Sequence, residues 1–233
     1  MIKKIIFDLD NTLIDWQDSY YNFAIENACK DLKLISRNNE ILKLVINTMD
    51  NYEKKYDYFS VENIVKDLNL NKEITFTNEF VEKVLYYFSL CAPDNLDSKI
   101  IETLDYLNSK YELVVLTNWF ENYQIKRLEK SGISRYFTHV YGTDKIKNKP
   151  NRKAFETAAG NCSLNECVMV GDNLNTDVIG ALNCGMRAIY YNSKKNIVDS
   201  SIVCINKFED LVDLLWYKSC SVQKCIIKIS SQF

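Results

Sequence analysis

The chain of 233 residues is predicted to be an α/β protein with a Rossmann-like parallel sheet core and an inserted α-helical domain. Three observations predict this fold. From about residue 93 onward, short apolar runs alternate with amphipathic helical stretches. Residues 17–90 instead carry helical periodicity almost throughout. Several apolar runs also end abruptly in Asp, Thr or Asn, as strands of an open parallel sheet do at a ligand site. We expect a core formed by residues 1–15 and 93–216, a helical domain over 16–92, and a tail over 217–233 whose structure the sequence does not determine.

The first strand is predicted at the apolar run Ile5-Ile6-Phe7, and two aspartates follow it directly. Asp8 and Asp10 are one residue apart, so their side chains are expected to leave the strand end in the same direction. Like charges this close repel unless a cation or a proton separates them. The pair therefore indicates a metal site whose other residues lie later in the chain.

Four helices are expected in the inserted block, each with its apolar residues on one face. The predicted faces are Tyr20, Phe23, Ala24 and Ala28; Ile41, Leu44, Val45, Met49 and Tyr52; Val61, Ile64, Val65 and Leu68; and Phe80, Val81, Val84, Leu85 and Phe88. Residues 71–78 are a predicted loop. The chain is expected to enter the block near residues 13–18 and to leave it near 91–95, where Pro93-Asp94-Asn95 has the composition of a turn.

After Pro93 the chain reads as repeated βαβ units, which favours a parallel sheet with helices on both faces. The predicted strands cover 113–116, 139–141, 167–170, 188–191 and 202–205, and the predicted helices cover 100–107, 123–130, 152–159, 176–183 and 208–216. Ser131-Gly132 marks the end of one helix and Pro150-Asn151 the start of the next. The sequence does not decide whether Ile226–Ile229 is an edge strand, a partner contact or a disordered tail.

Composition excludes some classes of function. The net charge is −2 and there is no basic stripe or tail, so we expect no nucleic-acid partner. No apolar run is long enough to cross a bilayer, and the chain enters the acidic motif without a signal peptide, so no membrane partner is expected. The eight cysteines form no CxxC pair and are expected to be reduced thiols of a cytoplasmic protein. The oligomeric state is not predictable.

Polar residues follow three of the predicted strands: Asp8, Asp10 and Thr12; Thr117 and Asn118; and Asp172 with Asp177. Lys149, before Pro150, is expected on the same side of the sheet. These stretches, FDLDNT, LVVLTN, the lysine of KP, and VMVGDNLNTD, resemble the four motifs of the haloacid dehalogenase-like hydrolase superfamily in order and spacing. The resemblance covers residues 1–15 and 93–216, and an inserted helical block after the first motif resembles the C1-type cap of subfamily I.

The chemistry of phosphate-ester cleavage agrees with what this resemblance implies. A nucleophile, a proton for the leaving group, and neutralisation of phosphoryl charge are needed. Asp8 is expected to attack and to carry a transient aspartyl-phosphate, while Asp10 protonates the leaving oxygen and then activates water. Mg²⁺, which prefers oxygen ligands, would be held by Asp8, the carbonyl of Asp10 and Asp172, with Asp177 outside or bound through water. Four further residues are expected to bind the phosphoryl group or hold it in place: Thr12, Thr117, Asn118 and Lys149.

Some of these residues have alternatives. Asp8, Asp10 and Asp172 could be turn or helix-cap residues, and Asp177 could be only a charge favoured at a helix N-terminus. Thr12 is expected to orient its neighbours by hydrogen bonding. Lys147 competes with Lys149, and Ile146 departs from the glycine that the family often has three residues before the lysine; Pro150 favours Lys149.

The residue types also bear on the reaction. Within the superfamily that the chain resembles, the presence of Asp10 implies phosphoryl transfer rather than dehalogenation, and Asn11-Thr12 implies hydrolysis rather than phosphomutase activity. The expected substrate is a small phosphorylated metabolite. The motifs look most like the nucleoside 5′-monophosphatase branch, in which Trp16 and Trp119 either stack a base or seal the junction of the two domains. Phosphoglycolate and sugar-phosphate phosphatases share the motifs and remain alternatives, as does a non-catalytic phosphometabolite-binding protein.

Overall fold

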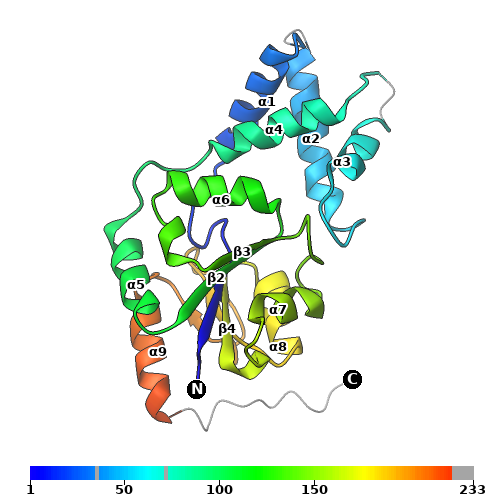
Figure 1. Ribbon diagram of the computed structural model, residues 1–233. Coiled ribbons are helices and arrows are strands. Elements are labelled where there is room, and N and C mark those ends of the chain that lie inside the picture. Colours follow the sequence, from blue (N-terminus) through cyan, green and yellow to red (C-terminus); the bar gives the residue numbers. More distant parts are fainter. Residues whose placement is uncertain (35–36, 71–72, 222–233) are drawn as a thin grey trace.

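In the computed structural model, six parallel strands form one sheet in the order β3-β2-β1-β4-β5-β6 (Figure 1). Residues 1–34, 37–70 and 73–221 are described. The strands are β1 (Lys4–Phe7), β2 (Glu112–Thr117), β3 (His139–Gly142), β4 (Cys167–Gly171), β5 (Arg187–Tyr191) and β6 (Cys204–Ile205). The α/β fold class predicted from the sequence is confirmed.

The strand order reverses between β1 and β4. Successive strands are added on one side of β1 up to β3, and β4 to β6 are then added on its other side. Phe7 of β1 pairs with Val115 of β2 and with Val170 of β4, so the three strands end at nearly the same level. In an open α/β sheet this reversal leaves a crevice at the carboxyl ends of the strands, where ligands bind. The motif residues lie beyond these ends.

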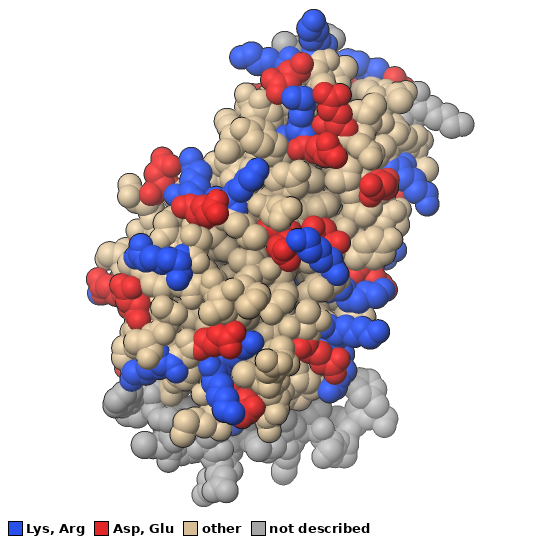
Figure 2. Space-filling model, in the orientation of Figure 1, with Lys and Arg blue, Asp and Glu red and all other residues tan. Residues whose placement is uncertain are grey.

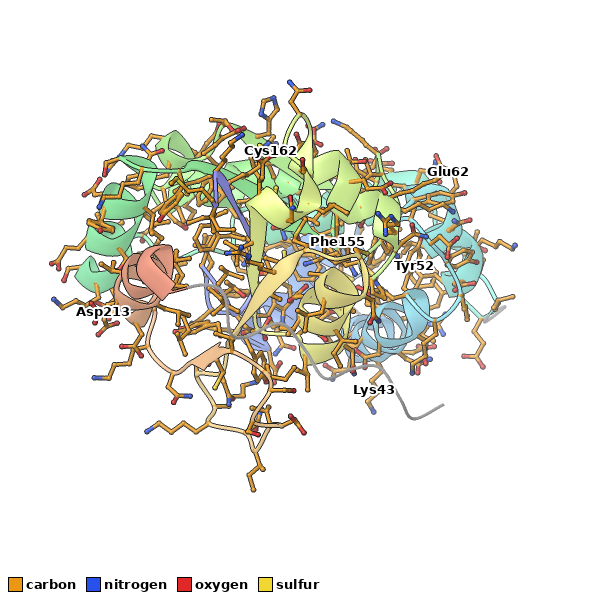
Figure 3. All side chains as sticks on the ribbon, turned by 90° about the horizontal axis from the view of Figure 1, so that it is seen from below. Lys43, Tyr52, Glu62, Phe155, Cys162 and Asp213 are labelled. Carbon is orange, nitrogen blue, oxygen red and sulfur yellow. The ribbon has the colours of Figure 1, made fainter. Side chains whose placement is uncertain are left out.

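Alternate residues of the central strands belong to different apolar clusters, one on each face of the sheet. Ile5 and Phe7 pack with α5 (Ser98–Asn108), α6 (Glu121–Lys130) and α9 (Asp210–Ser221). Ile6 packs on the opposite face with α7 (Arg152–Ala159) and α8 (Gly180–Asn183). This is the period of two that a strand buried on both faces requires. Figure 3 shows Phe155 of α7 in the interior and Asp213 of α9 at the periphery.

The helical block consists of α1 (Ser19–Asp31), α2 (Asn38–Tyr52), α3 (Val61–Leu68) and α4 (Asn78–Ser89). Their apolar faces form a third cluster, separate from the two clusters of the sheet. The hydroxyls of Ser60 and Thr77 accept hydrogen bonds from backbone N–H groups of the first turns of α3 and α4, which is why these helices begin there. Figure 1 shows the block above the carboxyl ends of the strands, with α4 next to α6.

Several predicted details differ from the structure. Phe23, predicted on the apolar face of the first helix, is 43% exposed, because α4 covers α1 along Ala24 and Ala28. The helix predicted from Thr176 begins earlier, with a π-helical turn over Leu174–Ile179 that continues into α8. The final strand is shorter than predicted, at Cys204–Ile205. The segment 226–229 lies outside the described residues.

Six cysteines whose side chains the structure describes carry free thiols: Cys29, Cys91, Cys162, Cys167, Cys184 and Cys204. Among the helices that the structure describes, none combines the length and the apolar character needed to cross a membrane. Figure 2 shows lysine and arginine mixed with acidic residues over the visible face.

Candidate active site

Asp8 directly extends β1 and is held in the sheet by its backbone, whose N–H donates to the Val170 carbonyl over 2.9 Å. The chain then closes a tight loop, in which the Leu9 carbonyl accepts from the N–H groups of Leu13 and Ile14 over 2.9 and 3.1 Å. Asn11 has a φ of 59° and accepts a side-chain hydrogen bond from the Trp16 N–H over 3.1 Å. Asparagine tolerates this left-handed conformation better than most residues do. The loop therefore has a defined shape.

Lys149 joins two aspartates that come from different strand ends. Its Nζ lies 2.6 Å from Asp8 Oδ1 and 2.7 Å from Asp177 Oδ1, and its side chain is 2% exposed. Thr12 adds a longer hydrogen bond, in which its hydroxyl donates to Asp8 Oδ2 over 3.4 Å. The competing Lys147 instead pairs with Asp57 at the surface, over 2.7 Å. Of these two lysines, Lys149 is the one at the site.

Asp172 and Asp177 reach the same place from the end of β4. Gly171 makes this possible, because a Cβ atom there would lie 2.2 Å from Asp177 Oδ2. The Asn173 N–H donates to Asp177 Oδ2 over 3.1 Å, which fixes the carboxylate within the π-helical turn. Carboxylate oxygens of Asp8, Asp172 and Asp177 lie within 4.8 Å of one another. Such a set of hard oxygen donors fits Mg²⁺.

The electrostatics of this cluster are those of an acidic site with too little positive charge. Burial, opposed by Lys149 and reinforced by Asp177 and Asp172, raises the pKa of Asp8 well above its ordinary value. Burial and then Asp177 raise the pKa of Asp172 to about 6. Burial alone would lower the pKa of Lys149, but Asp177 and Asp8 outweigh it and the pKa is raised. One ammonium thus faces three carboxylates, and a bound divalent cation would relieve their repulsion.

Thr117 and Asn118, predicted to bind phosphoryl oxygens, are the last residue of β2 and the residue that follows it. Thr117 Oγ1 accepts from Gln124 Nε2 over 3.1 Å, and no acceptor for its own hydrogen is found among the described residues. The Asn118 amide is more fully engaged with the Lys149 backbone. Its Oδ1 accepts from the Lys149 N–H over 2.8 Å and its Nδ2 donates to the Lys149 carbonyl over 3.0 Å. Thr117 is free to donate to a ligand, whereas Asn118 holds the segment that carries Lys149.

Glu53, from the helical block, was not predicted to lie at the site. Its Oε2 accepts a hydrogen bond from Asn118 Nδ2 over 3.0 Å, and Lys149 and Asp177 are close enough to act on it electrostatically. Glu53 is exposed as a residue, yet its carboxylate is partly desolvated, and this burial raises its pKa. The end of a predicted amphipathic helix gives no sign of such a contact, since it depends on how the block is docked.

Asp10 does not join the other carboxylates; its two oxygens are bound by α6. Arg127 NH1 donates to Oδ1 over 2.5 Å, and Gln124 Nε2 donates to Oδ2 over 2.8 Å. Gln124 and Arg127 are 0% and 1% exposed. Sequence reasoning treated 123–130 only as a helix and missed both. The available signal was two polar residues three positions apart, on the same side of the helix as the buried Leu128.

Trp16 and Trp119 lie where the block meets the sheet domain. The Trp16 ring contacts Tyr20, Tyr21 and Phe88, and the Trp119 ring contacts Phe59, Phe88 and Phe120. Both rings are partly buried in the cluster of the helical block. These contacts support the interpretation that both tryptophans seal the junction.

The sequence is similar to known hydrolases. The sequence model of the haloacid dehalogenase-like hydrolases matches residues 2–185. The chain is 30% identical over 201 residues to a glyceraldehyde 3-phosphate phosphatase of Methanothermobacter thermautotrophicus, which covers 83% of this chain and 87% of that protein. It is 28% identical over 138 residues to the pyrimidine 5′-nucleotidase PynA of Streptococcus pneumoniae, covering 56% of this chain and 58% of that protein.

Solved structures show the same fold at lower identity. The hydrolase YfnB from Bacillus subtilis, bound to magnesium, has a TM-score of 0.67 at 18% identity and covers 92% of this chain and 98% of its own. A 2-haloacid dehalogenase from Pseudomonas syringae has a TM-score of 0.67 at 21% identity and covers 93% of this chain and 99% of its own. Phosphatases and dehalogenases share this fold, so the reaction must be argued from the residues of the site.

Proposed function

The chain belongs to the haloacid dehalogenase-like hydrolases, and on that premise we propose that it is a Mg²⁺-dependent phosphatase of small phosphomonoesters. The observation that carries the proposal is the cluster of Asp8, Lys149, Asp172 and Asp177 at the point where the strand order reverses. A buried nucleophile, a buried cation and a set of oxygen donors are the parts that phosphoryl transfer needs.

In the proposed reaction, a carboxylate oxygen of Asp8 attacks phosphorus and the bond to the leaving oxygen breaks. Asp10 gives that oxygen its proton, and an aspartyl-phosphate forms on Asp8. Asp10, now ionised, takes a proton from the water that attacks phosphorus next, which releases inorganic phosphate and restores Asp8. Thr117 would donate to a phosphoryl oxygen, and Lys149 would hold Asp8 in place and offset the charge.

Mg²⁺ would be held by Asp8, the backbone carbonyl of Asp10 and Asp172, and when bound it would neutralise charge on the phosphoryl oxygens. Asp177 is better placed as a residue that orients Lys149, since its Oδ1 contacts the ammonium and its Oδ2 accepts from the Asn173 N–H. The presence of Asp10 favours phosphatase over dehalogenase chemistry, because dehalogenation leaves no oxygen to protonate.

For the substrate we propose the phosphate ester of a small, uncharged, hydroxylated alcohol, with α1–α4 acting as the cap that covers it. The phosphatase relative that spans most of the chain acts on glyceraldehyde 3-phosphate by its name, which supports a triose or sugar phosphate. The nucleotidase relatives cover smaller shares and keep a nucleoside 5′-monophosphate as a second candidate. Glu53 at the mouth of the site favours hydroxyl donors and disfavours a second carboxylate, as in phosphoglycolate.

Hydrolysis of p-nitrophenyl phosphate tests the activity. We expect turnover with Mg²⁺, none with EDTA, and none with Asp8→Asn. Asp15→Asn is the matched control and should keep wild-type rates, because it changes an exposed carboxylate just after the loop that carries Asp10. Folded wild-type protein without turnover, or turnover insensitive to EDTA, would refute the proposal and favour a binding protein. A phosphate-release panel of glyceraldehyde 3-phosphate, sugar phosphates, nucleotides and phosphoglycolate then ranks the substrates.

A further inference from the structure

Arg127 is a buried arginine on α6, a helix that packs against one face of the sheet. Its guanidinium binds Asp10 Oδ1 through NH1, and its Nε donates to the Cys91 carbonyl over 2.8 Å. The guanidinium also lies 5.5 Å from the centre of the Trp16 ring, within the range of a cation–π contact. Burial of an arginine is unfavourable unless its charge is paired, and here the partner is the carboxylate of Asp10.

Gln124 binds the other oxygen of the same carboxylate. Its Nε2 donates to Asp10 Oδ2 over 2.8 Å, and its Oε1 accepts from Arg127 NH1 over 2.9 Å. Both oxygens of Asp10 are therefore held by hydrogen bonds from one face of α6, which restricts rotation of the carboxylate. A carboxylate that transfers protons must point at the leaving oxygen within a narrow range of angles and distances.

The contacts of Arg127 also reach the two places where the chain passes between the sheet domain and the helical block. Trp16 precedes α1, and Cys91 follows α4. Any rearrangement of either crossing would change the surroundings of Arg127, and through Arg127 those of Asp10. NH2 of Arg127 is buried and has no hydrogen-bond partner among the described residues, so two N–H groups of the guanidinium are available for a different arrangement.

We propose that Arg127 is a positioning residue that orients Asp10 for proton transfer and links that orientation to the crossings of the helical block. The inference rests on the proposed function, because it assumes that Asp10 handles protons. Gln124 supports it by binding the second carboxylate oxygen. Arg127 acts through Asp10: its guanidinium contacts are to Asp10, Gln124, the Cys91 carbonyl and the Trp16 ring, and none of them is to Asp8, which is proposed to attack phosphorus.

The kinetic test compares substrates with two kinds of leaving group in the variant Arg127→Lys. This variant keeps the positive charge and loses the planar guanidinium, which binds Asp10 and the Cys91 carbonyl at the same time. An alkyl leaving group needs the proton of Asp10, whereas p-nitrophenolate leaves without one. We use kcat/KM because it reports phosphoryl transfer to Asp8 and not the later attack of water. For the best alkyl phosphate of the panel, kcat/KM should fall at least 30-fold, whereas for p-nitrophenyl phosphate it should fall less than about 3-fold.

The matched control is Leu128→Ala, which creates a cavity on the same helix at a fully buried residue. It should lower Tm without separating the two substrates. If Arg127→Lys reduces kcat/KM equally for both substrates, as a merely structural change would, the inference is wrong.

A second measurement does not depend on activity. Tm is measured for Asp10→Asn, Arg127→Lys and the double variant. Because each single variant breaks the same contact, the Tm change of the double variant should be smaller than the two changes added together. Additive changes would overturn the proposed link. A third outcome separates the two proposals: the wild-type protein hydrolyses neither substrate, but the Tm changes are non-additive. That result would refute the proposed function and leave the Arg127–Asp10 contact established.

Discussion

At the scale of single residues, the Asp8 cluster is stabilised by one cation in a place that water hardly reaches. Lys149 contacts both Asp8 and Asp177, and the side chains of Lys149 and Asp177 are 2% and 1% exposed. Two buried carboxylates without this ammonium would have to take up protons or admit water, and both changes oppose folding. Lys149 therefore matters for stability as well as for the proposed reaction.

Lys149→Met should lower the free energy of unfolding by about 3–5 kcal/mol, because it leaves buried carboxylates unpaired. Urea denaturation in EDTA measures this change. Lys147→Met is the matched control: it removes an ion pair whose lysine is 41% exposed, and should cost less than about 1 kcal/mol. Equal effects of the two variants would contradict the assignment of Lys149.

The raised pKa of Asp172 predicts how pH changes the stability of the metal-free protein. Its pKa in the folded state is raised to about 6, so the folded protein binds more protons than the unfolded chain between pH 4 and 6. Stability in EDTA should consequently fall as pH rises through this window, by about 1–2 kcal/mol after allowance for solvent screening. Thermal denaturation at pH 5 and 8 tests this, and Asp172→Asn should reduce the difference.

Mg²⁺ should reverse this trend. Protons and the metal compete for the same carboxylates, so Mg²⁺ should raise Tm more at pH 8 than at pH 5. A Tm increase that is independent of pH, or that persists in Asp172→Asn, would show that the metal binds elsewhere.

At the scale of elements, the segment between α2 and α3 joins the helical block to the loop that carries Lys149. We call residues 53–59 the docking segment. The Phe59 N–H donates to the Thr143 carbonyl over 2.8 Å, and the Asn148 N–H donates to the Asp57 carbonyl over 2.7 Å. Glu53 contacts Asn118 from the same segment. A residue next to the helical block thus reaches the site through backbone pairing that positions the whole segment.

Glu53→Gln should change substrate preference without abolishing activity. Removal of the negative charge should raise kcat/KM for phosphoglycolate several-fold to tenfold, since it removes repulsion across a partly desolvated gap. The kcat/KM for glyceraldehyde 3-phosphate should not rise. Asp57→Asn changes an exposed carboxylate of the same segment and is the control. If both variants shift phosphoglycolate turnover equally, Glu53 has no special place in the site.

At the scale of the whole molecule, the helical block has its own apolar cluster, and the sheet has one on each face. The block and the sheet domain meet along α4 and α6, at the two chain crossings and at the docking segment. Part of this boundary is apolar, since Phe120, Trp119 and Tyr123 of the sheet domain pack in the block's cluster. The backbone hydrogen bonds of the docking segment can break without exposing the two sheet clusters, which is a local opening of the kind that substrate entry requires.

Hydrogen exchange tests this opening. The amides of Phe59 and Asn148, whose partners lie across the boundary, should exchange at least tenfold faster than those of Val115 and Met169 in the central strands. Mg²⁺ with vanadate should slow the first pair. Equal protection of all four amides would mean that the block and the sheet domain open only by global unfolding.

The sequence by itself determined the parts of this protein that follow from local patterns. Period-two and helical apolar spacing located the strands and helices. Polar residues at strand ends predicted that Asp8 and Asp172 come close together, because parallel strands end at one edge of a sheet. Boundaries such as the start of the π-helical turn were missed, since they depend on Asp177 fitting against Gly171.

The tertiary structure alone decided which polar side chains meet across elements. The contacts of Arg127 and Gln124 with Asp10 and of Glu53 with Asn118 depend on how helices and loops dock. The sequence already favoured Lys149 over Lys147, but docking decides that Lys149 pairs with both Asp8 and Asp177. These contacts form because a buried charge or hydrogen-bond donor is unfavourable unless it is paired. The partner can lie up to 141 positions away in the sequence. No local pattern in a sequence records such a pairing.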